Sequence, residues 1–303
     1  MFSSFSLPCT RYLILLVLLL TSGQLQARTI EVDVLFSDNH RLHVQVVQAL
    51  KHALRADDIR LFPIVENGDT SEETRALNQV LARRPDLIVL VGDDALNAAS
   101  SMGIHIPMLS LLSIRLHASM ADNMPLTGID MRPDPVRVVQ GVEPLMQGAA
   151  TVLTYYSPAL SVDYIRQAEI AFGKSRLQLI ARPWPADNVL RSLHRDMQKA
   201  NLYWMQLEPK MADADTLHYL FSVATRHGKQ LIGLSAKYVR AGALIAWTPE
   251  FDVIGHQAAV MANRILAGEK PQNMAIEHPQ GMKASLNSSA VHGHAHSDGG
   301  KSG

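Results

Sequence analysis

Short β-branched runs alternate with amphipathic helical segments along most of the sequence. The first series predicts strands at 30–36, 59–65, 87–91 and 106–109, with apolar residues at helical spacing between them. The rhythm is interrupted around 127–130, and Pro133 and Pro135 then open a new helix. Regular alternation of strands and helices builds parallel sheets covered by helices on both faces. The sequence therefore predicts an α/β protein with two doubly wound parallel-sheet lobes joined by a hinge.

The second series begins after the interruption and predicts strands at 150–155, 176–181, 202–207, 230–234 and 244–247. A periodic helix at 251–266 follows, and Gly268 and Pro271 supply the stop signals for it. A last strand at 284–287 also needs a sheet, and we place it in the first lobe together with that helix. The predicted organisation is a first lobe of 28–127 plus 250–287, a second lobe of 128–249, and a disordered tail of His, Gly and Ser over 288–303.

Residues 1–27 have the pattern of a secretory signal peptide. Arg11 gives a positive start, an apolar run covers 12–21, and the small Ala27 closes the segment. The apolar run is shorter than the roughly 20 residues needed to cross a bilayer core, which disfavours a permanent anchor. The single cysteine, Cys9, precedes the run, so cleavage removes the thiol that lipidation or a disulfide would need. We therefore expect an exported, unlipidated protein in the periplasm.

The charge balance argues against highly charged partners. Lys plus Arg and Asp plus Glu both number 28, so no net field attracts nucleic acid or an anionic membrane. No second run is apolar enough to insert into a membrane. The sequence contains no HExxH, Walker, GxSxG or GxGxxG motif and so gives no positive support to a hydrolase or a nucleotide-binding protein. We expect a small-molecule ligand and no cofactor.

Several phrases occur in an order typical of one family. They are PDLIVLVG at 85–92, Thr127-Gly128 before an acidic residue, KYVRAGALIA at 237–246, GHQAA at 255–259, ILAGEKP at 265–271, and Leu286-Asn287. Together they resemble a family of ABC-transporter substrate-binding proteins, often called the uncharacterised ABC substrate-binding family, some of whose members are linked to aromatic amino acid uptake. The resemblance implies a type I periplasmic binding fold, a ligand cleft between the lobes and an ABC permease in the inner membrane as partner. It also implies chain crossings near 126–133, 246–252 and 276–284.

Candidate ligand-binding residues in the first lobe follow from the rule that open α/β sheets bind ligands beyond the carboxyl ends of their strands. Asp93 and Asp94 are adjacent carboxylates, which repel unless a cation, water or an ammonium group offsets them, and this favours a cationic or zwitterionic ligand. Helix capping is the alternative for these side chains. The full candidate set in this lobe is Ser37, Asp38, Asn39, Gly92, Asp93, Asp94, Ser110 and Asp130.

In the second lobe the candidates are Tyr156, Ser157, Ser235 and Trp247. Alternation along a strand places one of Tyr155 and Tyr156 in the core, and we assign Tyr156 to the ligand. Trp247 either stacks on the ligand or fills the hinge, and filling is favoured. The sequence departs from the family at Tyr156-Ser157-Pro158, where relatives tend to carry Asn-Pro. It also lacks the usual polar site in the loop at 208–213, so an aromatic amino acid ligand is not carried over from the family.

Three histidines at the C-terminus, His292, His294 and His296, could bind Zn or Ni, but a solvated low-complexity end is favoured and no metal site is assigned. The leading hypothesis is a monomeric, non-enzymatic periplasmic protein that captures a small organic solute, such as an amino acid or amine, by hinge closure. One alternative is a solute sensor that docks on a membrane receptor or kinase. Another is a small-molecule enzyme that uses Asp93 or Asp94 with Tyr156.

Overall fold

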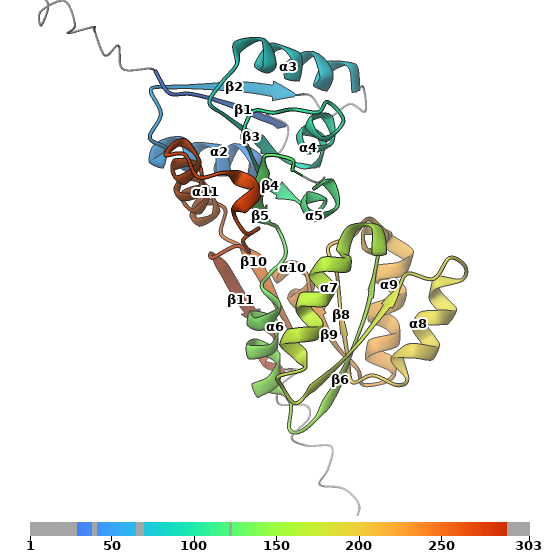
Figure 1. Cartoon of the computed structure of the whole chain (residues 1–303). Coiled ribbons are helices and arrows are strands. Elements are labelled where there is room, and N and C mark those ends of the chain that lie inside the picture. Colours follow the sequence, from blue (N-terminus) through green and yellow to red (C-terminus); the bar gives the residue numbers. More distant parts are fainter. Residues whose placement is uncertain (1–28, 38–40, 65–69, 121–122, 290–303) are drawn as a thin grey trace, which may run out of the picture.

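The computed structural model describes residues 29–37, 41–64, 70–120 and 123–289, which form two lobes, each built on its own sheet (Figure 1). The predicted α/β class is confirmed. The expected signal peptide with Cys9, the candidates Asp38 and Asn39, and the histidines of the tail lie outside the described residues.

The first lobe contains a five-stranded parallel sheet in the order β2-β1-β3-β4-β5. Its strands are β1 (Glu31–Ser37), β2 (Asp58–Ile64), β3 (Leu87–Val91), β4 (Met108–Ser113) and β5 (Leu126–Asp130). Its helices are α2 (Arg41–Ala53), α3 (Thr70–Arg83), α4 (Asp93–Ser100) and α5 (Leu116–Ser119). β5 occupies the segment that interrupts the sequence pattern, and all five of its residues are buried.

Helices cover both faces of this sheet. Side chains of β1 alternate between the two faces: Val34 packs in the cluster with α2, whereas Leu35 packs in the cluster with α3 and α4. All five residues of β3 are apolar and buried, as expected for a strand at the centre of a parallel sheet. Late in the chain, α11 (Phe251–Leu266) returns to this lobe and lies against α2 (Figure 1).

The second lobe contains a six-stranded sheet in the order β11-β10-β9-β8-β6-β7. Its strands are β6 (Ala150–Tyr156), β7 (Leu177–Pro183), β8 (Leu202–Trp204), β9 (Gln230–Gly233), β10 (Ile245–Pro249) and β11 (Met282–Leu286). Its helices are α6 (Pro135–Val142), α7 (Pro158–Phe172), α8 (Val189–Met197), α9 (Ala214–Arg226) and α10 (Ala236–Arg240). Short 3₁₀ turns lie at η1 (Glu143–Leu145) and η2 (Pro209–Ala212), whereas η3 (Pro271–Asn273) lies against β5 of the first lobe.

The placement of the last strand in the first lobe is wrong. β11 pairs antiparallel with β10, with Ile245 opposite Leu286 and Pro249 opposite Met282, so it belongs to the sheet of the second lobe. Before it, the chain lies against the first lobe from α11 up to Glu277, which bridges to Ile129 at the edge of β5. By pairing with β10, β11 covers the backbone groups that β10 would otherwise expose at the edge of the sheet.

The chain passes between the lobes three times. The first passage follows β5 and reaches Pro135, the second joins β10 to α11 at Glu250, and the third runs from Glu277 to the start of β11. The second and third passages are tied together, because the backbone N–H of Glu250 donates to the carbonyl oxygen of Gly281 at 2.9 Å. These three segments form the hinge region.

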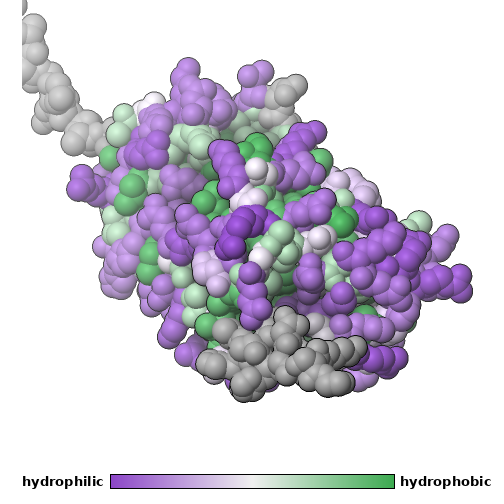
Figure 2. Space-filling model, turned by 90° about the horizontal axis from the view of Figure 1, so that it is seen from below, coloured by the Kyte–Doolittle hydropathy of each residue, from purple (hydrophilic) through white to green (hydrophobic). Residues whose placement is uncertain are grey.

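Hydrophilic residues cover most of the face seen in Figure 2, and hydrophobic residues occur there only in small patches between them. Within the described residues, none of the helices has the length and apolar character that a membrane span requires. The apolar side chains of both lobes lie mainly between sheets and helices.

Close packing of α11 on α2 depends on Gly255, and this gives a stability test. A methyl group at this position would lie 2.5 Å from Cβ of Ala49 and 2.6 Å from the carbonyl oxygen of Val46. Gly255→Ala should therefore lower the free energy of unfolding by about 1–3 kcal/mol in urea denaturation, although alanine normally favours a helix over glycine. The control is Gly148→Ala, because that position has open space around it. Equal stability of the two variants would contradict the packing.

Candidate ligand site between the lobes

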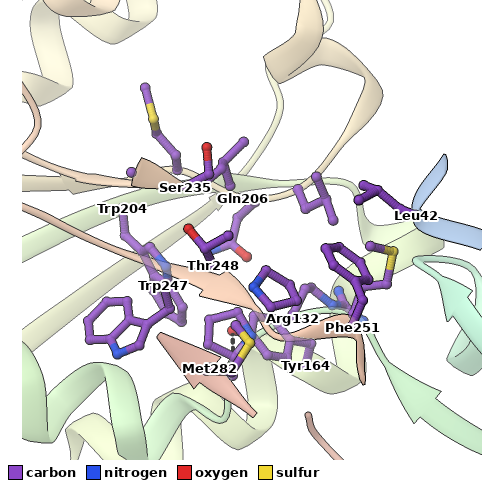
Figure 3. Close-up of a pocket in the computed structure, with 17 residues that line it drawn as sticks. Leu42, Arg132, Tyr164, Trp204, Gln206, Ser235, Trp247, Thr248, Phe251 and Met282 are labelled. Atoms are coloured by element: carbon purple, nitrogen blue, oxygen red, sulfur yellow. Dashed lines mark hydrogen bonds between the residues drawn. The ribbon is translucent and has the colours of Figure 1, made fainter. Parts of the chain in front are cut away.

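A cavity of about 340 Å³ opens where the carboxyl ends of the second lobe's strands approach the hinge. The residues after β8 and β9 and the end of β10 form most of it, which follows the general rule for ligand sites in α/β sheets. The first lobe contributes Leu42 from α2 and Phe251 from α11, and the hinge contributes Met131 and Arg132 (Figure 3). The other lining residues are Pro133, Tyr164, Trp204, Met205, Gln206, Leu207, Gly233, Leu234, Ser235, Trp247, Thr248, Pro249 and Met282.

Aromatic side chains form a large part of the wall. The rings of Tyr164 and Trp204 are tilted against each other with centroids 5.8 Å apart, and Phe172 stacks behind Trp204 at 5.7 Å. Trp247 packs on α6, where a methyl group added to Gly141 would lie 2.5 Å from the indole. Because each ring is held from behind by the core, the wall is preformed rather than assembled around a ligand.

A buried ion pair lies where the first passage leaves β5. The guanidinium of Arg132 donates to both carboxylate oxygens of Asp130, and both side chains are almost completely buried. The imidazole of His117 approaches the same carboxylate, with its Nε2 3.5 Å from Oδ2. Burial by itself would raise the pKa of Asp130, but the charge of Arg132, its hydrogen bonds and the nearby imidazole of His117 outweigh that effect and hold the pKa well below its usual range.

The ion pair continues into the second lobe as a chain of hydrogen bonds. Arg132 donates from Nη1 to the hydroxyl of Ser161 at 2.9 Å, and this hydroxyl donates to Glu208 at 2.7 Å. The Glu208 carboxylate also accepts from the backbone N–H of Ser157 and from the indole N–H of Trp184. One network therefore connects the end of β5, the N-terminus of α7 and the loop after β8.

The third passage between the lobes contacts the same hydrogen-bond network through His278. Its Nδ1 lies 3.2 Å from the carbonyl oxygen of Arg132, and its Nε2 lies 2.8 Å from Oε1 of Gln167 on α7. Burial lowers the pKa of His278 and so favours the neutral ring. On the other side, Tyr164 is held by its hydroxyl, which donates to Pro133, and by the Arg132 guanidinium 4.3 Å above its ring.

A family model described as ABC transporter substrate binding protein matches residues 30–294. The chain belongs to this family. The resemblance that the sequence motifs suggested is thereby confirmed. No curated protein matches the sequence.

Solved structures of similar fold include other substrate-binding proteins. One is an "ABC domain in complex with L-Trp" from Streptococcus pneumonia, with a TM-score of 0.60, 15% identity, and coverage of 88% of this chain and 94% of that one. Another is a ligand-free, open substrate binding protein with adhesive properties from Clostridium difficile, with a TM-score of 0.62, 14% identity, and coverage of 86% and 93%. At these identities the likeness establishes the fold, which is the expected two-lobed type I periplasmic binding fold.

The first-lobe candidates that the structure of this substrate-binding protein describes do not line the cavity. Gly92 precedes α4 with a φ of +95°, and a methyl group there would lie 2.8 Å from the ring of His43. The Asp93 carboxylate accepts from the hydroxyl of Ser113 and from the backbone N–H of Ile114, so it organises the loop after β4. The half-buried Asp94 follows Asp93 in α4 and does not line the cavity.

The remaining first-lobe candidates have different surroundings. Ser37 ends β1, and its side chain is outside the description. Ser110 is fully buried in β4, and its hydroxyl has no hydrogen-bond partner among the described residues. Asp130 does not line the cavity itself but holds Arg132, which does.

Second-lobe candidates divide evenly. Ser235 and Trp247 line the cavity. Tyr156 instead packs against the cluster beside α6 and α7, and Ser157 precedes α7 and donates its backbone N–H to Glu208. The sequence analysis did place Tyr155 correctly, since this side chain is buried and its hydroxyl donates to Asp196 at 2.7 Å.

Sequence reasoning missed several residues of the site, among them Arg132, Tyr164 and Gln206. Gln206 follows the end of β8, so the carboxyl-end rule could have selected it. Tyr164 gives no comparable signal, because it lies within α7 and reaches the cavity from the helix.

Removal of one partner from the buried ion pair should be costly. Asp130→Asn leaves the Arg132 charge buried without its counter-charge, and we expect the free energy of unfolding to fall by about 3–5 kcal/mol in chemical denaturation. Asp130→Asn combined with Arg132→Met removes both charges and should recover part of that loss. Asp163→Asn is the control, because it breaks an exposed pair with Arg166 that is worth at most about 1 kcal/mol. A small loss in Asp130→Asn, comparable to the control, would contradict the assigned role.

The same pair predicts a pH dependence. The pKa of Asp130 is lower in the folded protein than in the unfolded chain, so its stabilisation is complete above the unfolded value of about 3.9 and is lost as the pH falls toward the folded value. The stability difference between the wild type and Asp130→Asn should be constant from about pH 8 to pH 5 and should narrow below about pH 4. Denaturant unfolding over this pH range measures the stability difference. A difference that grows as the pH falls would contradict the lowered pKa of Asp130.

Proposed function

We propose that this member of the family is a periplasmic solute-binding protein that captures a small organic solute between its lobes and delivers it to an ABC permease. The observation that carries the proposal is the cavity itself, which is lined from both lobes and from the hinge. A solute held there contacts segments that move when the lobes change their angle, and such differential contact is what allows a ligand to shift the population toward a closed form.

The lining favours a solute with a largely apolar body. Arg132 is the only charged side chain among the described lining residues, and Asp130 balances its charge. Most other lining side chains are aromatic, aliphatic or thioether groups. Desolvating an ionic solute in this site would cost free energy without a free counter-charge to offset it. The amine ligand that Asp93 and Asp94 suggested is therefore disfavoured, because these two residues do not line the cavity.

Export to the periplasm and a monomeric state remain part of the proposal. Export rests on the signal-peptide pattern of 1–27 and on the position of Cys9 before the apolar run. The permease is inferred from the family. The enzyme alternative loses its candidates for acid and base, because Asp93, Asp94 and Tyr156 do not line the cavity.

Blocking the cavity should separate binding from folding. Ser235 lines the cavity in an extended backbone conformation that any residue can adopt, so Ser235→Phe places a ring in the binding space without straining the chain. Native mass spectrometry of protein purified from the periplasm of its own host should find a bound solute on the wild type and none on Ser235→Phe. The same solute should raise the melting temperature of the wild type but not that of Ser235→Phe.

Ser222→Phe is the matched control, since Ser222 lies on α9 away from the cavity. This variant should carry the solute as the wild type does. Equal loading of Ser235→Phe and Ser222→Phe would mean that the solute binds elsewhere, and an empty wild type that no periplasmic extract stabilises would contradict solute capture. Delivery requires in addition that uptake of the identified solute by host cells be lost with the gene and restored by the wild type but not by Ser235→Phe.

A further inference from the structure

The amide of Gln206 is a buried polar group of the cavity wall, and its orientation is fixed. The side chain is 2% exposed, and its Nε2 lies 3.1 Å from the hydroxyl of Thr154, which is fully buried on β6. The Thr154 hydroxyl in turn donates to the carbonyl oxygen of Trp204 at 2.8 Å. Three groups from two neighbouring strands therefore form a short hydrogen-bonded chain behind the wall.

The polarity of this chain follows from donor and acceptor chemistry. A carbonyl oxygen only accepts, so the single proton of the Thr154 hydroxyl points to Trp204. The hydroxyl can then only accept from Gln206, which requires that the NH₂ group, and not the oxygen, faces Thr154. The amide orientation is thus fixed by its partners, and Oε1 is left without a donor among the described residues.

The hydroxyls of Thr248 and Ser235 do not provide an acceptor of fixed direction. The Thr248 hydroxyl accepts from the backbone N–H of Ala236 at 3.1 Å and keeps its own proton for donation. Ser235 has no side-chain capping bond at α10, so its hydroxyl rotates freely between donor and acceptor roles. Gln206 Oε1 is therefore an amide acceptor of the cavity whose direction is fixed.

We propose that Gln206, oriented by Thr154, makes this site specific for uncharged solutes that carry an N–H or O–H donor on an apolar body. The inference rests on the proposed function and specifies the solute class. A solute without the donor would leave Oε1 buried and unpaired. The free-energy cost of the unpaired oxygen separates the affinities of two solutes more strongly than a change in apolar contact does. Gln206 acts as a specificity residue, and Thr154 acts through it as a positioning residue.

Matched probe pairs test the proposal, because each pair differs only in its donor. We would measure the affinities of indole and 1-methylindole, and of p-cresol and 4-methylanisole, by isothermal titration calorimetry. The wild type should prefer the donor-bearing member of each pair by about tenfold or more. Gln206→Met keeps the length of the side chain but removes the amide, so it should bind both members within about threefold of each other.

Two variants of Thr154 test the positioning role with a readout that a purely structural effect would not change. Thr154→Val removes the hydroxyl and frees the amide to turn, so the preference for the donor should fall while the methylated probes bind as well or better. Thr154→Ser restores a hydroxyl and should restore the preference. Gln198→Met, at the exposed C-cap of α8, controls for the loss of an amide elsewhere.

The outcomes separate the two proposals. Binding of both members of each pair with equal affinity by the wild type would overturn the role of Gln206 while leaving the cavity as the binding site. A preference that persists in Gln206→Met would show that the added methyl group, and not the missing donor, is rejected. Failure of all four probes to bind a wild type that has been stripped of its native solute and still rebinds that solute would overturn the solute class. Binding unaffected by Ser235→Phe would count against the proposed site itself.

Discussion

The Asp130–Arg132 ion pair is the interaction on which the arrangement of the lobes and the cavity depends. It lies where the chain leaves the first sheet, and both charges are almost fully buried. A buried charge is tolerated only with a close counter-charge and saturated hydrogen bonds, and both conditions are met here. Arg132 then supports Tyr164 of the wall, reaches Ser161 of the second lobe and offers its backbone carbonyl to His278.

In the proposed capture of a solute, this position gives the pair a role beyond stability. Arg132 lines the cavity and also connects the first and third passages between the lobes. A solute that packs on Tyr164 would therefore lie next to the hinge residue Arg132. Asp130 neutralises the charge of Arg132 inside the protein. The cavity therefore offers apolar surface and directed hydrogen bonds instead of an unpaired charge. Recognition by shape and by one oriented amide follows from that balance.

Much of the fold could be predicted from the sequence, because the alternation of strands and helices is a local pattern. The last strand was misplaced since pattern alone does not tell which sheet edge is open, and β10 provides such an edge. β5 was missed because its short run, Leu126–Asp130, mixes apolar and polar residues although every one of them is buried. The site was harder to predict: the carboxyl-end rule finds Ser235 but also Asp93, whose carboxylate serves the local loop. Arg132 and Tyr164 owe their roles to contacts across long sequence distances.

A crystal structure of the protein with the solute that it carries from its host would test the central claim most directly. The account predicts solute density against Tyr164, Trp204 and Trp247, with the ion pair of Asp130 and Arg132 intact behind it. Density elsewhere, such as at the Asp93 loop of the first lobe with an empty aromatic wall, would contradict the account.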